Sequence, residues 1–245
     1  MHNLGVTRGA QQRNHFLQTP DTFIRAPLPG MRAATAIVHV APANGAAFTQ
    51  YTAEMQFGGT LGPTAGQRFL YVLEGTVTLG EDNKLEKDGY VYLPAGVSKS
   101  VVASAQTRLA VIEKPYLSLA GFEPPAFLTS HASAVPTQPL LGDESVQVRA
   151  LLPETPAHDF AVNLMTFEPG ATLPLTEMHI MEHGLLLLEG GGIYRLGDCW
   201  YPVSAGDFIW MAPFCPQWFG ALGKSPAQYL LYKDWNRHPL ERSSK

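Results

Sequence analysis

Phe69-Leu-Tyr-Val-Leu-Glu-Gly75 recurs in altered form as Gly184-Leu-Leu-Leu-Leu-Glu-Gly190, and this repeat decides the fold. Both runs are apolar and end in Glu-Gly. Each is followed by a short strand-like segment, at 76–79 and 192–196, and then by a turn. Further along, 88–94 parallels 206–213, and each copy ends in another strand, at 109–114 and 229–233. Because the two copies agree in the order of their elements, we interpret them as an internal repeat.

The repeated segments are short, rich in β-branched and aromatic residues, and bounded by Gly, Pro and Asp, which is typical of antiparallel all-β structure. We therefore expect an all-β chain with two tandem barrel or sandwich domains, at 1–120 and 121–245. The segment from Ser118 to Ser145, rich in Pro, Ser, Ala and Gly, is expected to connect them. One large sandwich with chance similarity between its halves is the alternative.

The composition and charge of the chain argue against several classes of protein. Charged residues make up 16% of the chain, the net charge is −4, and no basic block occurs. This pattern argues against a nucleic-acid partner or an anionic membrane surface. The first residues do not form a signal peptide, no apolar run reaches the length of a membrane span, and two cysteines are too few for a disulfide scaffold. We expect a reduced, cytoplasmic protein that has no contact with membranes.

The second repeat contains Glu177-Met-His179-Ile-Met-Glu182-His183. If residues 177–179 lie on a strand, Glu177 and His179 share one face, and His183 can converge with them from the next element. Two imidazoles and a carboxylate suit Mn, Fe, Zn, Ni or Co and leave coordination positions for water and substrate. Glu182 could replace Glu177 as the carboxylate. The alternative to a metal site is that the two histidines form a hydrogen-bonded pair without a metal.

Gln217 is the candidate for a fourth ligand, because it follows the strand that ends at Pro213. An amide oxygen is a weak, hard ligand. It favours Mn or Fe(II) over a closed structural zinc site.

These residues resemble the first motif of the cupin superfamily, with Gly170 and Gly190 bracketing Glu-x-His-x3-His in place of the common ligand order. Two copies resemble a bicupin, which implies two tandem cupin barrels of the double-stranded β-helix or jelly-roll type. The pattern is most similar to the (S)-ureidoglycine aminohydrolase family, which has Glu-x-His-x3-His-Gly, a later Gln and a final Lys-Asp-x-Asn-Arg. Here the final motif is Lys233-Asp-Trp-Asn-Arg237.

The resemblance implies specific roles and an activity. The Mn²⁺ ligands would be Glu177, His179, His183 and Gln217, although another divalent metal remains open. Glu177, Tyr194, Tyr229 and Lys233 would contact the substrate, and Glu177 and Lys233 would be catalytic. The implied reaction converts (S)-ureidoglycine, a small anionic substrate, to (S)-ureidoglycolate and ammonia in purine and allantoin degradation.

The N-terminal copy departs from this pattern. When the two Glu-Gly pairs are aligned, the positions of Glu177, His179 and His183 are taken by Gly62, Thr64 and Arg68. Lys99 or Ser98 falls near the Gln217 position. Arg and Lys offer only donors, so we expect no metal in this domain. We expect it to serve barrel pairing in a homo-oligomer.

Two other functions remain open from the sequence. One is another metal-dependent cupin enzyme, a dioxygenase or isomerase, because two imidazoles and a carboxylate also resemble the facial triad of non-haem iron enzymes. The other is a non-enzymatic cupin that binds a small molecule. The fold alone does not separate them.

Overall fold

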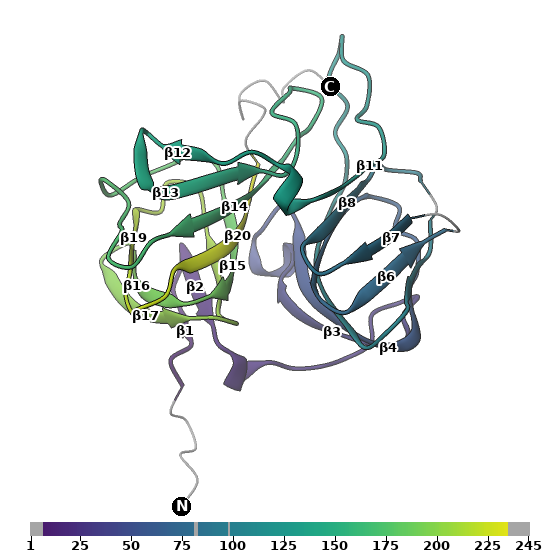
Figure 1. The fold of residues 1–245 in the computed structure, drawn as a ribbon, viewed down its shortest axis with the longest axis horizontal. Coiled ribbons are helices and arrows are strands. Elements are labelled where there is room, and N and C mark those ends of the chain that lie inside the picture. The colour runs from purple at the N-terminus through teal and green to yellow at the C-terminus, as the bar shows by residue number, and fades with distance from the viewer. Residues whose placement is uncertain (1–6, 81–82, 98, 235–245) are drawn as a thin grey trace, which may run out of the picture. The chain divides into compact units, whose positions relative to one another are not determined.

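The computed structural model (Figure 1) describes residues 7–80, 83–97 and 99–234. The chain forms two compact units. One comprises the described residues of 24–135 and 155–159, and the other comprises those of 1–23, 136–154 and 160–245. Both are built from β-strands, and the regions described contain three short 3-10 turns, η1 (Pro20–Thr22), η2 (Pro42–Asn44) and η3 (Ala132–Ala134), but no α-helix. The predicted all-β class is confirmed.

The unit that carries the second repeat holds two sheets. Its larger sheet has the strand order β1 (Ala10–Gln11), β2 (His15–Gln18), β18 (Phe208–Met211), β15 (His183–Glu189), β20 (Ala227–Lys233), β14 (Ala161–Phe167), β13 (Asp143–Ala150) and β12 (Gln138–Leu140). Its smaller sheet has the order β17 (Cys199–Ser204), β16 (Gly191–Leu196) and β19 (Gln217–Ala221). All these pairs are antiparallel. One apolar cluster, which includes Leu185, Leu187, Phe219 and Tyr229, fills the space between them.

The unit that carries the first repeat is a single nine-stranded sheet with its own core. The order is β11 (Leu128–His131), β8 (Gly89–Leu93), β5 (Gln67–Glu74), β10 (Thr107–Lys114), β4 (Thr49–Leu61), β9 (Val101–Ala103), β6 (Thr76–Leu79) and β7 (Asn83–Glu86), and β3 (Arg32–Val40) pairs with β4. Leu70, Val72, Leu109 and Val111 point into the core. The residues between them, such as Tyr71 and Ala110, lie on the other face of the sheet and are also buried.

The repeated Glu-Gly marks the same bend in both units. Gly75 and Gly190 have φ angles of +80° and +64°, a region that L side chains rarely adopt. A Cβ on Gly190 would stand 2.5 Å from Pro226 O, and one on Gly75 would meet Gln106 O in the same way. Glycine is therefore required where β5 passes into β6 and where β15 passes into β16.

The units differ from the expected boundaries of 1–120 and 121–245. Strand β2 pairs with β18 in the C-terminal barrel, β1 pairs with β2, and Phe16 stacks on Trp210 with ring centroids 5.6 Å apart. Residues 121–135 belong to the first unit, because β11 pairs with β8. The segment from Ser118 to Ser145 is thus more than a connection, since its ends form strands of both units.

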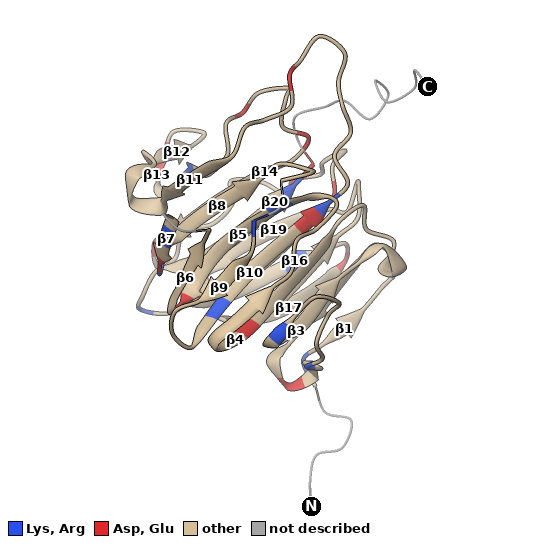
Figure 2. Ribbon diagram, turned by 90° about the vertical axis from the view of Figure 1, so that its right-hand side faces the viewer, with Lys and Arg blue, Asp and Glu red and all other residues tan. Residues whose placement is uncertain are grey.

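Lys and Arg are interspersed with Asp and Glu along the strands (Figure 2). Within the described part of the chain, no helix has the length and apolar character needed to cross a membrane.

Candidate functional site

A cavity of about 400 Å³ opens inside the C-terminal barrel. Its polar lining includes every site residue predicted from the sequence: Glu177, His179, His183, Tyr194, Gln217, Tyr229 and Lys233. Apolar side chains supply most of the remaining wall, among them Leu140, Met165, Leu173 and Leu231. The structure therefore brings together seven residues that span 57 positions of the sequence, from 177 to 233.

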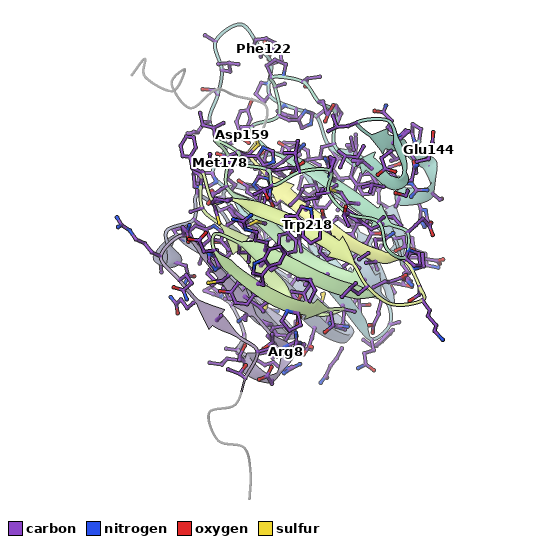
Figure 3. All side chains as sticks on the ribbon, turned by 90° about the vertical axis from the view of Figure 1, so that its left-hand side faces the viewer. Arg8, Phe122, Glu144, Asp159, Met178 and Trp218 are labelled. Atoms are coloured by element: carbon purple, nitrogen blue, oxygen red, sulfur yellow. The ribbon has the colours of Figure 1, made fainter. Side chains whose placement is uncertain are left out.

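Glu177 and His179 lie in a loop, where the sequence suggested a strand. The loop is fixed by one isolated bridge, in which Glu177 N donates to Gln217 O and Gln217 N donates to Glu177 O, both at 2.8 Å. The side chains of residues 177–179 still alternate in direction, as they would on a strand. Met178 is 63% exposed and lies at the edge of the strands in Figure 3, whereas the side chains of Glu177 and His179 line the cavity.

The two imidazoles stand side by side, with ring centroids 5.2 Å apart and 19° between their planes. His183 is the first residue of β15. Its Nδ1 lies 3.3 Å from Met181 O, and because a carbonyl only accepts, Nδ1 carries the proton. The lone pair of Nε2 is then available as a ligand. Burial, followed by the nearby His179 and Lys233, lowers the pKa of His183 to about 3, which keeps the ring neutral.

Two members of the donor set have the spacing of ligands on one divalent ion. Glu177 Oε2 and His179 Nε2 are 3.1 Å apart. Two donors bound to one ion at right angles, with bonds of about 2.1 Å, stand about 3.0 Å apart. Elsewhere in the cavity wall, the amide oxygen of Gln217 adds a hard donor. Among the described residues, no three His, Cys, Asp or Glu side chains already converge as closely as metal ligands do.

Two tyrosines complete the polar wall. The Tyr194 hydroxyl donates to Gln217 Oε1 at 2.9 Å, which orients the amide oxygen. Burial raises the pKa of Tyr194, and the Glu177 carboxylate adds to this shift. The pKa of Tyr229 is raised by burial and by Tyr194 and Glu177. Both phenols therefore stay protonated and act as hydrogen-bonding groups.

Lys233 ends β20 and pairs with His183 across the sheet. Burial lowers its pKa, while Glu154 and Glu177 act in the opposite direction. Asn163 also lines the cavity, next to Lys233, and the sequence analysis missed it. Its signal was a polar side chain at an inward position of an apolar strand, between Val162 and Leu164.

Glu182 does not serve as the alternative carboxylate, because it points away from the cavity. It is buried and accepts a hydrogen bond from Trp210 Nε1 at 3.1 Å. The alternation that turns Glu182 outward also turns its neighbour His183 inward.

The first unit fills the corresponding position with an ion pair. Arg68 pairs with Glu113 across the sheet, as His183 pairs with Lys233 in the other unit. The Arg68 and Glu113 side chains approach to 2.6 Å, and Arg68 Nη1 donates to Gly62 O at 2.7 Å. The Arg68 guanidinium offers only hydrogen-bond donors, and the carboxylate beside it is engaged by this guanidinium.

The counterpart of Gln217 in the first unit is equally unsuited to a metal. The ammonium of Lys99 lies 4.9 Å from the centre of the Phe127 ring. Ser98, the other candidate for this position, lies outside the described residues, as do Trp235, Asn236 and Arg237 of the final motif.

Comparison with known proteins places this chain in a family. Residues 163–232 match the cupin domain model. A probable (S)-ureidoglycine aminohydrolase of Oryza sativa subsp. japonica is 44% identical, over 96% of this chain and 78% of the relative. The (S)-ureidoglycine aminohydrolase of Arabidopsis thaliana is 43% identical, over 96% and 80%.

A solved structure agrees with the sequence relatives. The crystal structure of a putative glyoxylate induced protein of Pseudomonas aeruginosa has a TM-score of 0.87 and 30% identity, and covers 97% of this chain and 94% of that one. The residues that line the cavity, the fold and the named relatives all indicate the same family. The chain belongs to the (S)-ureidoglycine aminohydrolase family of cupin enzymes.

Proposed function

We propose that this chain hydrolyses (S)-ureidoglycine to (S)-ureidoglycolate and ammonia, in the degradation of purine-derived allantoin, with a divalent metal ion such as Mn²⁺. The observation that carries the proposal is the single cavity lined by Glu177, His179, His183, Gln217 and Lys233. Relatives that are 43–44% identical over most of the chain carry the name of this activity.

Glu177, His179, His183 and Gln217 would hold the metal. When bound, such an ion polarises substrate oxygen or nitrogen and lowers the pKa of a water molecule. Two neutral imidazoles, one carboxylate and one amide oxygen leave the site with a net positive charge around a dication. That balance suits a substrate that carries a carboxylate.

Lys233 would bind the substrate carboxylate as a point charge. The hydroxyls of Tyr194 and Tyr229 stay protonated and can hydrogen-bond the polar ureido or carboxylate groups. Apolar walls at Met165, Leu173 and Leu231 keep water away and so strengthen each electrostatic contact.

Glu177 would move the proton. Its carboxylate takes a proton from the attacking water and passes it to the substrate's α-amine. A C–O bond forms at the α-carbon, the C–N bond breaks, and the nitrogen leaves as ammonia. One water is consumed for each ammonia released, so atoms and charge balance.

The test is an ammonia-release assay on freshly prepared ureidoglycine, with and without added Mn²⁺. We expect a metal-dependent rate well above the spontaneous one. A rate equal to the spontaneous one would refute the proposal. Oxygen uptake in place of ammonia release would identify the alternative cupin oxygenase.

A further inference from the structure

Asn163 occupies an inward position of β14 and is 5% exposed. Its side-chain oxygen accepts a hydrogen bond from Lys233 Nζ at 3.2 Å, and its side-chain nitrogen donates to Val162 O at 3.2 Å. Both ends of the carboxamide are therefore engaged. The contact to the backbone fixes the plane of the amide and aims its oxygen at the ammonium.

We propose that Asn163 is a positioning residue that holds the Lys233 ammonium towards the cavity with a neutral partner, so that the site selects a substrate carboxylate. The Lys233 ammonium has three N–H groups, and it donates one of them to Asn163. Because an amide carries no charge, Asn163 can orient the ammonium without neutralising it. This inference rests on the proposed function for the identity of the physiological substrate.

The first unit also has a residue at the strand position that corresponds to Asn163. Tyr51 pairs with Val111 as Asn163 pairs with Leu231, which makes Tyr51 the counterpart of Asn163. The Tyr51 hydroxyl donates to Glu113 Oε1 at 2.9 Å, and the same oxygen pairs with Arg68. In each unit this position holds the charged residue at the end of the neighbouring strand.

The outcome differs between the two units because the charges differ. In the first unit, Glu113 is neutralised by Arg68 inside the barrel. In the second, Lys233 faces a cavity of about 400 Å³ and is held by an uncharged amide. The strand pairing around this position is the same in both units. In the second unit, however, the charged residue points towards space that a ligand can fill.

The decisive variant is Asn163→Asp, which keeps the size of the side chain and places a carboxylate beside Lys233. Asn163→Ser removes the amide without adding charge, and it serves if the first variant fails to fold. The control is Tyr51→Phe, which removes the corresponding hydrogen bond in the first unit. Binding of oxamate and of its uncharged analogue oxamide is measured by calorimetry on metal-loaded protein, together with kcat and KM for ureidoglycine.

We expect Asn163→Asp to weaken oxamate binding at least 10-fold and to leave oxamide binding unchanged. KM for ureidoglycine should rise by a similar factor, and more than kcat falls. Asn163→Ser should weaken oxamate binding less, and Tyr51→Phe should not change it. Unchanged oxamate binding in Asn163→Asp, or equal losses for oxamate and oxamide, would overturn the inference.

The two proposals fail in different ways. If the wild-type protein releases no ammonia from ureidoglycine, the proposed function is wrong. The comparison of oxamate with oxamide still decides whether Asn163 and Lys233 select a carboxylate.

Discussion

Glu177 and Gln217 exchange two backbone hydrogen bonds of 2.8 Å each, although 40 positions separate them in the sequence. This bridge places the loop that carries Glu177 and His179 against the first residue of β19. Two candidate metal ligands are therefore brought together by the backbone, independently of their side chains. The same loop is also held where Trp218 Nε1 donates a hydrogen bond to Leu173 O at 2.9 Å.

Because the backbone forms this contact, removing the metal should leave the fold intact. We expect protein treated with a chelator to keep its far-ultraviolet circular dichroism spectrum and to lose ammonia release. Added Mn²⁺ should restore the activity. Loss of the β signal on chelation would show instead that the metal is needed for folding, as in structural metal sites.

Replacing one ligand should separate metal binding from substrate binding. We expect His183→Ala to abolish metal binding, because it removes a buried imidazole whose Nε2 is free to coordinate. Lys233→Ala should keep the metal and lose turnover, because it removes the charge that binds the substrate. Elemental analysis of both variants checks this. One metal per chain in His183→Ala would show that the site is assigned wrongly.

Tyr194 should support the metal without touching it. Its hydroxyl donates to Gln217 Oε1, so Tyr194→Phe leaves the amide free to turn. Loss of such outer partners typically lowers metal affinity about 10- to 100-fold. Mn²⁺ titration followed by electron paramagnetic resonance measures the change, and Tyr229→Phe is the matched control. Equal affinities in both variants would assign Tyr194 to the substrate alone.

The sequence predicts the frame of the fold well for a physical reason. The Glu-Gly pairs at 74–75 and 189–190 mark a bend that only glycine permits, and this local constraint is visible in the residues themselves. The pairing of β2, at residues 15–18, with β18 has no such local signal. It depends on contacts between segments almost 200 positions apart, such as Arg8 with Asp207.

The sequence locates some features of the candidate site and misses others, for identifiable reasons. All seven predicted residues line the cavity, since their motif and spacing are specific. The strand expected at 177–179 is a loop, and Pro174 three residues earlier is a signal that could have demoted it. Asn163 was missed because a single polar residue in an apolar strand has no motif.

Arg8 should anchor the N-terminal strands to the C-terminal barrel. Its guanidinium contacts Asp207 at 2.7 and 2.9 Å, and the Asp207 side chain is fully buried whereas that of Arg8 is 41% exposed. We expect Arg8→Ala to lower the free energy of unfolding by about 1–3 kcal/mol, less than the roughly 3–5 kcal/mol of a fully buried pair, because water reaches Arg8.

Urea denaturation of Arg8→Ala measures this loss. Arg25→Ala is the control, because Arg25 and Glu54 form an ion pair of the same length, 2.7 Å, in which Arg25 is 51% exposed. The control should lose clearly less than Arg8→Ala, because water screens an exposed ion pair. Equal losses in the two variants would show that the Arg8–Asp207 ion pair stabilises the protein no more than the exposed Arg25–Glu54 pair does.

His39 should make the first unit sensitive to acid. Its imidazole is buried between β3 and β4, and Nε2 lies 2.8 Å from Thr52 Oγ1. Burial, with a smaller effect of Arg108, lowers its pKa from about 6.5 to about 3. Between these values the unfolded chain binds a proton that the folded protein excludes, so stability falls as the pH falls from 6.5 towards 3. We expect His39→Asn to reduce this slope in urea denaturation series at several pH values. His131→Asn, at an exposed site, should leave the slope unchanged, and an unchanged slope in His39→Asn would mean that other groups cause the acid sensitivity.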